Sequence, residues 1–270
     1  MALGWINLEN YSFNSFLLLE RFQIMRMFSP ERDEKWRRSM GIALNANPAV
    51  KWYLAHRCPA RAEAIAQIAR EAPDNPSAHK VRKAELHVME CAEDFVTYTT
   101  PEVMDTQCAF IRDWDKERLF EMADFEGKVV LDVGSGSGRL AFAAAQRAKE
   151  VYASEPVGTL REFIREKAAR EGIANIRVAE ALVLDIPYPD DTFDIVMSGH
   201  VVGDDWDTEV AELTRVCKPG GWLLDCPGDE TGRGKRHERA PQLAKRGWEE
   251  MHYVGNGGGD VWRYRKRVEK

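Results

Sequence analysis

The sequence has few cysteines, no long hydrophobic run and no excess of positive charge. Its 270 residues include five cysteines, an odd number without a dense framework, which indicates free thiols in a reducing compartment. No apolar run approaches the roughly 20 residues that a membrane-spanning helix needs. The formal net charge of -6 would repel a phosphate backbone, so a general nucleic-acid binder is not expected. These shortages favour a cytoplasmic protein without a membrane partner.

The sequence falls into two halves that differ in the secondary structure their patterns predict. Up to about Phe125 the chain is typical of helices, and its prolines stand near the expected helix starts, where a missing N–H costs nothing (Pro30, Pro48, Pro59, Pro76 and Pro101). After Gly127 short apolar runs alternate with helical stretches, as in a parallel sheet wound with helices. The first five expected strands are Val129 to Val133, Val151 to Ala153, Ile176 to Val178, Ile195 to Met197 and Trp222 to Asp225. We therefore expect a helical cap or substrate lid over residues 1–125 and an α/β domain over residues 126–270.

A glycine-rich loop follows the first apolar run of the second half. The run Lys128 to Val133 ends in Gly134-Ser135-Gly136-Ser137-Gly138, and a helical stretch begins at Arg139. Glycines let the backbone approach a ligand closely, and the helix N-terminus offers unpaired N–H groups to an anion. A dinucleotide fingerprint needs glycine or alanine at position six, counted from Gly134, but Arg139 stands there. The loop therefore departs from the pattern of nicotinamide and flavin proteins.

The segment Asp132-Val-Gly134-Ser-Gly136-Ser-Gly138 resembles the acidic-x-Gly-x-Gly-x-Gly motif of class I S-adenosylmethionine-dependent methyltransferases. Later segments agree with that family in order and spacing, from Lys128 to about Gly228. They are Glu155 after the second expected strand, the run Pro187-Tyr-Pro-Asp-Asp-Thr-Phe-Asp194 before the fourth, and Lys218-Pro-Gly-Gly221 before the fifth. The resemblance implies an α/β fold with a Rossmann-like, seven-stranded, mostly parallel sheet, helices on both faces and an antiparallel last strand, preceded by an all-helical N-terminal cap.

The resemblance also implies S-adenosylmethionine as the cofactor and assigns roles to residues. The loop backbone lies against the methionine moiety, Asp132 receives its ammonium, and Glu155 holds the ribose hydroxyls. Adenine lies after the third strand, where an unusually long segment leaves open whether Glu180 or Asp185 faces its amine. The expected cofactor-binding residues are Asp132, Gly134, Ser135, Gly136, Gly138, Glu155, Pro156, Glu180, Ala181, Leu182 and Ser198.

His200 is the candidate catalytic residue. It follows the fourth expected strand, where open parallel sheets place their ligands, and its pKa class suits a general base. Alternatively, it packs on the cofactor or caps the next helix. Asp204, Asp205 and Trp206 follow on the same rim, where they either bind a cationic or aromatic substrate or begin a helix.

No metal is expected. His56-x-Cys58 and His87-x-x-x-Cys91 could together supply four ligands, but neither spacing is a standard zinc site, and packed histidines with inert thiols are the simpler interpretation.

The leading hypothesis is methyl transfer to a small molecule, as in the quinone-biosynthesis-like branch of the family. One alternative is a protein or RNA substrate bound through the C-terminal 40 residues, which hold eleven Lys or Arg against five Asp or Glu. Another is a cofactor-binding module that regulates a partner without catalysis. The oligomeric state is left open by the sequence.

Two nucleic-acid subclasses fit less well. Ser198-Gly-His-Val stands where nucleobase-amine enzymes carry an Asn/Asp-Pro-Pro-aromatic segment, and no Pro-Cys stands there to supply the nucleophile of cytosine-C5 enzymes. Cys226 remains a minor alternative as an RNA-enzyme nucleophile. Substrate recognition is assigned to the N-terminal half, whose aromatic residues could line a pocket (Trp52, Tyr53, Trp114 and the run Phe95 to Tyr98).

Overall fold

The computed structural model describes residues 7–92, 99–228, 234–255 and 258–270. The chain divides into two compact units, Met1–Pro101 (unit 1) and Glu102–Lys270 (unit 2). The run Phe95 to Tyr98, one of the aromatic candidates, lies outside the described residues.

Unit 1 is helical, as predicted from its helical patterns and from the prolines near the expected helix starts. Capping explains several starts, because Asp33 accepts from the N–H of Trp36 at 2.7 Å and Pro48 occupies the first turn of its helix. The apolar faces meet in a core that includes Met40 and Ile65. The elements are η1 (Leu8–Asn10), η2 (Phe13–Leu18), α1 (Arg21–Met27), α2 (Glu34–Ala46), α3 (Pro48–Arg57), η3 (Pro59–Arg61), α4 (Ala62–Arg70) and α5 (Ala78–Cys91).

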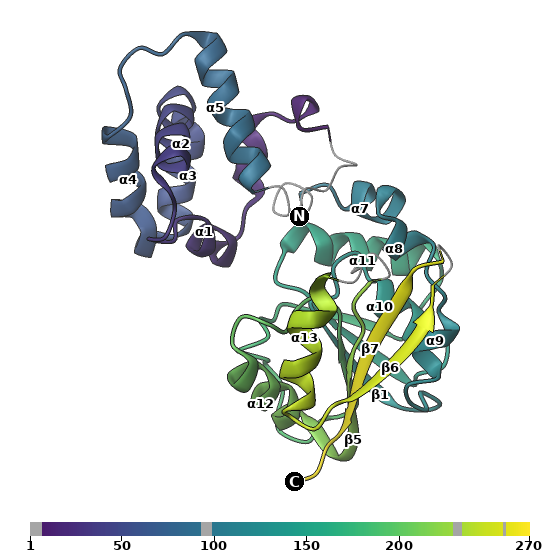
Figure 1. Ribbon diagram of the computed structural model, residues 1–270. Helices are drawn as coiled ribbons and strands as arrows, with labels where there is room; N and C mark the ends of the chain where they lie inside the picture. The colour runs from purple at the N-terminus through teal and green to yellow at the C-terminus, as the bar shows by residue number, and fades with distance from the viewer. Residues whose placement is uncertain (1–6, 93–98, 229–233, 256–257) are drawn as a thin grey trace. The chain divides into compact units, whose positions relative to one another are not determined.

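Unit 2 is built on a seven-stranded sheet of order β3-β2-β1-β4-β5-β7-β6, which confirms the predicted fold (Figure 1). The first five strands pair in parallel, and β7 runs antiparallel to both β5 and β6. The strands are β1 (Val129–Val133), β2 (Glu150–Ser154), β3 (Ile176–Ala179), β4 (Phe193–Ser198), β5 (Cys217–Asp225), β6 (Glu249–Val254) and β7 (Asp260–Arg267). Because β1 lies between β2 and β4, the strand order reverses there, and a crevice is expected at its carboxyl end.

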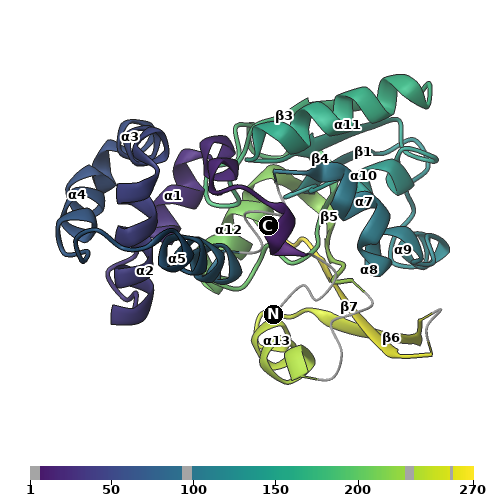
Figure 2. The same cartoon turned by 90° about the horizontal axis from the view of Figure 1, so that it is seen from above.

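Helices cover both faces of this sheet, because successive strand residues point to opposite sides. Val130 packs with α10 (Arg139–Ala144) and α11 (Gly158–Arg170), whereas Leu131 packs with α12 (Trp206–Val216) and α13 (Gly234–Ala244). Figure 2 shows α10 and α11 together on one side and α12 and α13 on the other.

Unit 2 begins earlier than the expected boundary near residue 125. Its first helices are α7 (Pro101–Gln107), α8 (Ala109–Arg112) and α9 (Glu117–Phe120). Trp114, Leu119 and Phe125 pack in the same core as Val130 of β1. The segment 102–125 is therefore part of the sheet unit, and the short link Glu126-Gly127 does not join the two units.

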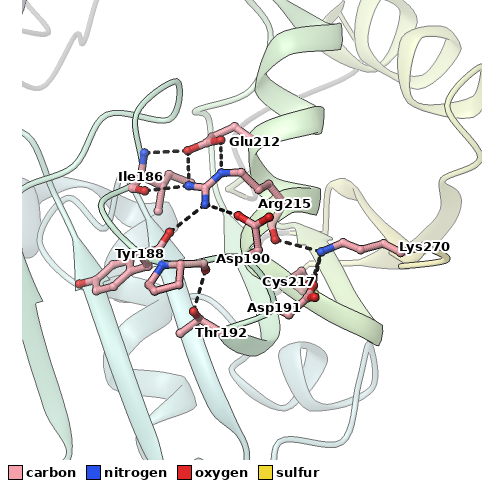
Figure 3. Close-up of polar contacts among 10 residues, drawn as sticks. Ile186, Tyr188, Asp190, Asp191, Thr192, Glu212, Arg215, Cys217 and Lys270 are labelled. Carbon is pink, nitrogen blue, oxygen red and sulfur yellow. Dashed lines mark hydrogen bonds and ion pairs between the residues drawn. The ribbon is translucent and has the colours of Figure 1, made fainter.

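The Pro187 to Asp194 motif is located before β4, away from the carboxyl ends of the strands. Arg215 of α12 donates to the carbonyls of Ile186 and Tyr188, each at 2.9 Å, and to the carboxylates of Asp190 and Glu212 (Figure 3). Glu212 in turn accepts from the N–H of Ile186 at 2.9 Å. These contacts fix the entry to β4.

Candidate functional site

The glycine loop after β1 has a backbone that only glycine adopts readily. Gly134, Gly136 and Gly138 have φ values of +67°, +58° and +91°. A methyl group built on Gly138 would lie 2.6 Å from the Phe142 ring, and one on Gly134 would lie 2.4 Å from Cγ2 of Val201. The N–H of Gly134 donates to the carbonyl of Ser154 at 2.7 Å, which fastens the loop to the end of β2.

Glu155 lies directly against this loop. One carboxylate oxygen accepts from the N–H of Gly136 and the other from the N–H of Val157, both at 2.9 Å. The residue is only 4% exposed. Burial raises the pKa of Glu155 to about 7, the two N–H donors lower it, and nearby Asp132 adds a smaller upward shift. Each oxygen keeps a further lone pair for a hydroxyl donor.

Asp132 is the second buried carboxyl of the site. It is 1% exposed, and burial raises its pKa to about 7 against the opposing effect of the Ser135 hydroxyl and the Arg139 charge. Within the described chain its Oδ2 has no hydrogen-bond partner, and neither do the buried hydroxyls of Ser137 and Ser198. Buried polar atoms are normally paired, so this group fits a polar ligand such as an ammonium or the water that it holds.

The residues expected near adenine follow β3. Ala181 is buried, whereas Leu182 is 43% exposed. Glu180 is exposed, and its carboxylate pairs with Arg161 at 3.1 Å; Arg161 also donates to the carbonyl of Glu155 at 2.8 Å. Asp185 closes a turn by donating its N–H to the carbonyl of Leu182 at 3.0 Å. Pro156 is half-buried beside Glu155.

His200 is exposed after β4 and has a left-handed φ of +63°. The N–H of Gly228 donates to its Nε2 at 2.9 Å, so that nitrogen already accepts a hydrogen bond. To act as a base through Nε2, His200 must first release Gly228. Asp205 caps α12 by accepting from the N–H of Thr208 at 3.3 Å, in agreement with the capping alternative.

Three residues at this site carried no sequence signal. Val201 covers Gly134, and Cε of Met104 lies 3.7 Å from a methyl group built on Gly136. Arg161 joins Glu180 to the backbone of Glu155. Their roles depend on which segments meet in space, so spacing along the chain does not reveal them.

The other chemical candidates are separate from this site. Cys226 is fully buried, and burial raises its pKa to about 11, which disfavours a thiolate. Over the described ranges no three His, Cys, Asp or Glu residues gather as metal ligands. The N–H of His56 Nδ1 is directed at the carbonyl of Trp52 at 2.8 Å, and Trp114 belongs to the core of unit 2. No described helix is both long and apolar enough to span a bilayer.

Comparisons with known proteins match the sheet unit. A family model described as a methyltransferase domain matches residues 131–225. A demethylmenaquinone methyltransferase of Geobacillus sp. is 30% identical over 116 residues, which are 41% of this chain and 50% of that protein. An uncharacterized protein of Mycobacterium tuberculosis is 35% identical over 99 residues, which are 36% of each chain. The chain thus spans half or less of the length of these two relatives.

The structural comparison agrees with the predicted fold. A solved S-adenosylmethionine-dependent methyltransferase from Aquifex aeolicus is 21% identical and has a TM-score of 0.53, over 63% of this chain and 98% of that chain. At this identity the likeness concerns the fold.

Proposed function

We propose that this protein, whose sheet unit is a class I S-adenosylmethionine-dependent methyltransferase domain, methylates a small molecule. The observation that carries the proposal is the placement of Glu155 and Asp132 beside the glycine loop, where the strand order reverses. A small acceptor is supported by the relatives that are named as demethylmenaquinone methyltransferases. A cytoplasmic location is part of the proposal, since Cys58, Cys91, Cys108, Cys217 and Cys226 are thiols rather than disulfide partners within the described residues.

The residues present fit the cofactor. We assign the ribose hydroxyls to the remaining lone pairs of Glu155, the ammonium to Oδ2 of Asp132 and the adenine to the segment Glu180 to Leu182. When bound, S-adenosylmethionine supplies a methyl group that its sulfonium makes electrophilic. The protein then has to hold the acceptor in line and exclude water. Nε2 of His200 accepts a hydrogen bond from Gly228. We therefore assign His200 to holding the loop after β4 in position rather than to an obligatory removal of a proton.

The class of acceptor is tested with labelled cofactor. Incubating the full chain with methyl-labelled S-adenosylmethionine and a fractionated cell extract should place the label in low-mass material. Label in polymer would instead support a protein or RNA acceptor. Cofactor binding without any transfer would support a regulatory module.

S-adenosylhomocysteine should raise the melting temperature of the protein, whereas NAD and NADP should not. A ligand that binds only the folded state stabilises it by about 2.7 kcal/mol at 100 times its Kd. Differential scanning fluorimetry over a ligand series measures the shift. A stabilisation by NAD but not by S-adenosylhomocysteine would contradict the cofactor assignment.

Glu155→Ala should weaken S-adenosylhomocysteine binding by about 1–3 kcal/mol, because it removes a charged acceptor from the ribose hydroxyls. Isothermal titration calorimetry gives the Kd directly. Glu162→Ala is the matched control, since Glu162 of α11 is 65% exposed and pairs with Arg165. An unchanged Kd in a folded Glu155→Ala variant would mean that the ribose lies elsewhere.

Binding of S-adenosylhomocysteine should tighten as the pH rises from 6 to 8. Burial raises the pKa values of Asp132 and Glu155 to about 7, so both carboxyls are largely protonated at pH 6 in the cofactor-free protein. An ammonium and two hydroxyl donors favour the ionised forms, so binding releases these protons. Over this range the Kd should fall by about tenfold for each carboxyl that must ionise.

Calorimetry in two buffers of different ionisation enthalpy measures the released protons. Glu155→Gln cannot ionise and should retain only the part of the pH dependence that belongs to Asp132. The same Kd at pH 6 and pH 8 in the unmodified protein would show that neither carboxyl changes its protonation on binding.

A further inference from the structure

Unit 1 contains a cavity between α3 and α4 whose lining includes none of the proposed cofactor-binding residues. Its volume is ≈550 Å³, within the range of about 300–1,000 Å³ that is usual for small-ligand pockets. Ile65, Ala66 and Ala69 of α4 contribute apolar lining. Alanine side chains are short, so a flat group can approach the helix closely.

Two cationic side chains, Lys51 and Arg70, line this groove. The short η3 joins α3 to α4, so the two helices run antiparallel and the start of α3 lies near the end of α4. Asn45 fixes that end by donating to the carbonyl of Ala69 at 2.8 Å, and Nζ of Lys51 lies 3.4 Å from its Oδ1. Arg70 also lines the cavity, and its partner Glu63, at 2.7 Å, is 82% exposed and outside the lining. The described lining contains no carboxylate.

Trp52 stands in the wall midway along the groove. It is 62% exposed, which is unusual for the largest hydrophobic side chain. Its ring stacks on His56 with centroids 4.0 Å apart and planes inclined by 22°. Because a carbonyl can only accept, Nδ1 of His56 must donate to Trp52 O at 2.8 Å, which holds the histidine ring in place. Trp52 is thus supported from one side while much of its surface remains open.

We propose that this groove binds a flat, hydrophobic anion of the aromatic carboxylate class. Its ring lies on Trp52 over the alanines of α4, and its carboxylate lies against the cations of Lys51 and Arg70. Stacking on Trp52 and burial of the ring supply the apolar part of the affinity. Lys51 and Arg70 favour a negatively charged ligand over an uncharged one of the same shape. The site belongs to unit 1 alone and does not depend on the methyltransferase proposal.

The test uses the full chain with 2-naphthoate as the anion and 2-naphthalenemethanol as its uncharged counterpart, both measured by calorimetry. Naphthoate should bind more tightly than the alcohol, and added salt should narrow the difference. Trp52→Ala should weaken both ligands by about tenfold. Lys51→Gln should weaken naphthoate by about three- to tenfold and leave the alcohol unchanged. Lys83→Gln, which removes an exposed lysine outside the groove, is the charge control.

A second variant leaves Trp52 in place. Ala66→Leu adds bulk to the lining and should block both ligands. Unchanged S-adenosylhomocysteine affinity in every variant would show that the effects belong to unit 1, whatever the outcome for methyl transfer.

Three results would overturn the proposal. They are no binding of naphthoate at millimolar concentration, binding that Trp52→Ala and Ala66→Leu leave unchanged, and equal affinity for the acid and the alcohol. Light scattering supplies a fourth: a dimer that Trp52→Ala converts to a monomer would assign the groove to a second copy of the chain instead.

Discussion

Replacing Asp225 by Ala should destabilise unit 2 by about 3–5 kcal/mol, which is the usual cost of leaving one charge of a buried pair without its partner. Asp225 ends β5 and is 0% exposed. Arg239 of α13 contacts both of its carboxylate oxygens at 2.6 Å and also donates to the carbonyl of Val202 at 2.8 Å. One guanidinium therefore joins β5, α13 and the loop after β4.

Hydrogen-exchange mass spectrometry can assign this loss to unit 2, because it reports β5 and α13 separately from unit 1. The exchange of β5 amides should become faster in Asp225→Ala. Adding Arg239→Met removes the buried cation that Asp225→Ala leaves without its partner. The double variant should therefore recover part of the lost stability. Glu117→Gln is the control, since it breaks an exposed pair with Arg147 and should cost less than about 1 kcal/mol. Equal losses from the buried and the exposed pair would refute this account.

The loop after β4 links that pair to the cofactor site. It carries His200, and Val201 from the same loop covers Gly134. Asp225→Ala should therefore also weaken S-adenosylhomocysteine binding, whereas Glu117→Gln should not.

The sheet and the glycine loop could be predicted because their signals are local. The backbone of the loop is left-handed at three alternate positions, and each of these positions carries a glycine. Apolar runs of strand length indicate the parallel strands. The order of strand, loop and acidic residue places Glu155 beside the loop, where the structure has it 2.9 Å from the N–H of Gly136.

The unit boundary could not be predicted from the helical texture. A helical period identifies an apolar face but not the core against which it packs. Residues 102–125 have the same texture as unit 1, yet Leu119 and Phe125 pack with the sheet. Long-range contacts could not be predicted for the same reason. One example is the hydrogen bond from the N–H of Gly228 to Nε2 of His200, which joins residues 28 positions apart in the sequence. The Pro187 to Asp194 motif likewise has a structural contact that its own sequence does not reveal, because Arg215 of α12 donates to the carbonyl of Tyr188.

We propose that unit 1 supplies the substrate lid. Within the described part of unit 2, only α12 stands between β4 and β5 and only α13 between β5 and β6, which leaves little chain for an inserted cap. We therefore assign recognition of the acceptor largely to unit 1. The appropriate truncation starts at Glu102, because a start at Asp124 would remove Trp114, Leu119 and Met122 from the core.

A protein of residues 102–270 should bind S-adenosylhomocysteine and yet lose methyl transfer by about 100-fold or more. The glycine loop, Glu155 and Met104 all remain in it, so the residues that we assign to the cofactor are retained. Without a lid, neither the acceptor position nor the exclusion of water is maintained, and positioning alone can account for a loss of this size. Label transfer to the same extract fraction compares the two proteins, after circular dichroism and S-adenosylhomocysteine binding have shown that the shorter one is folded. Equal transfer would place the acceptor on unit 2 alone and leave unit 1 as a separate binding domain, which its size permits.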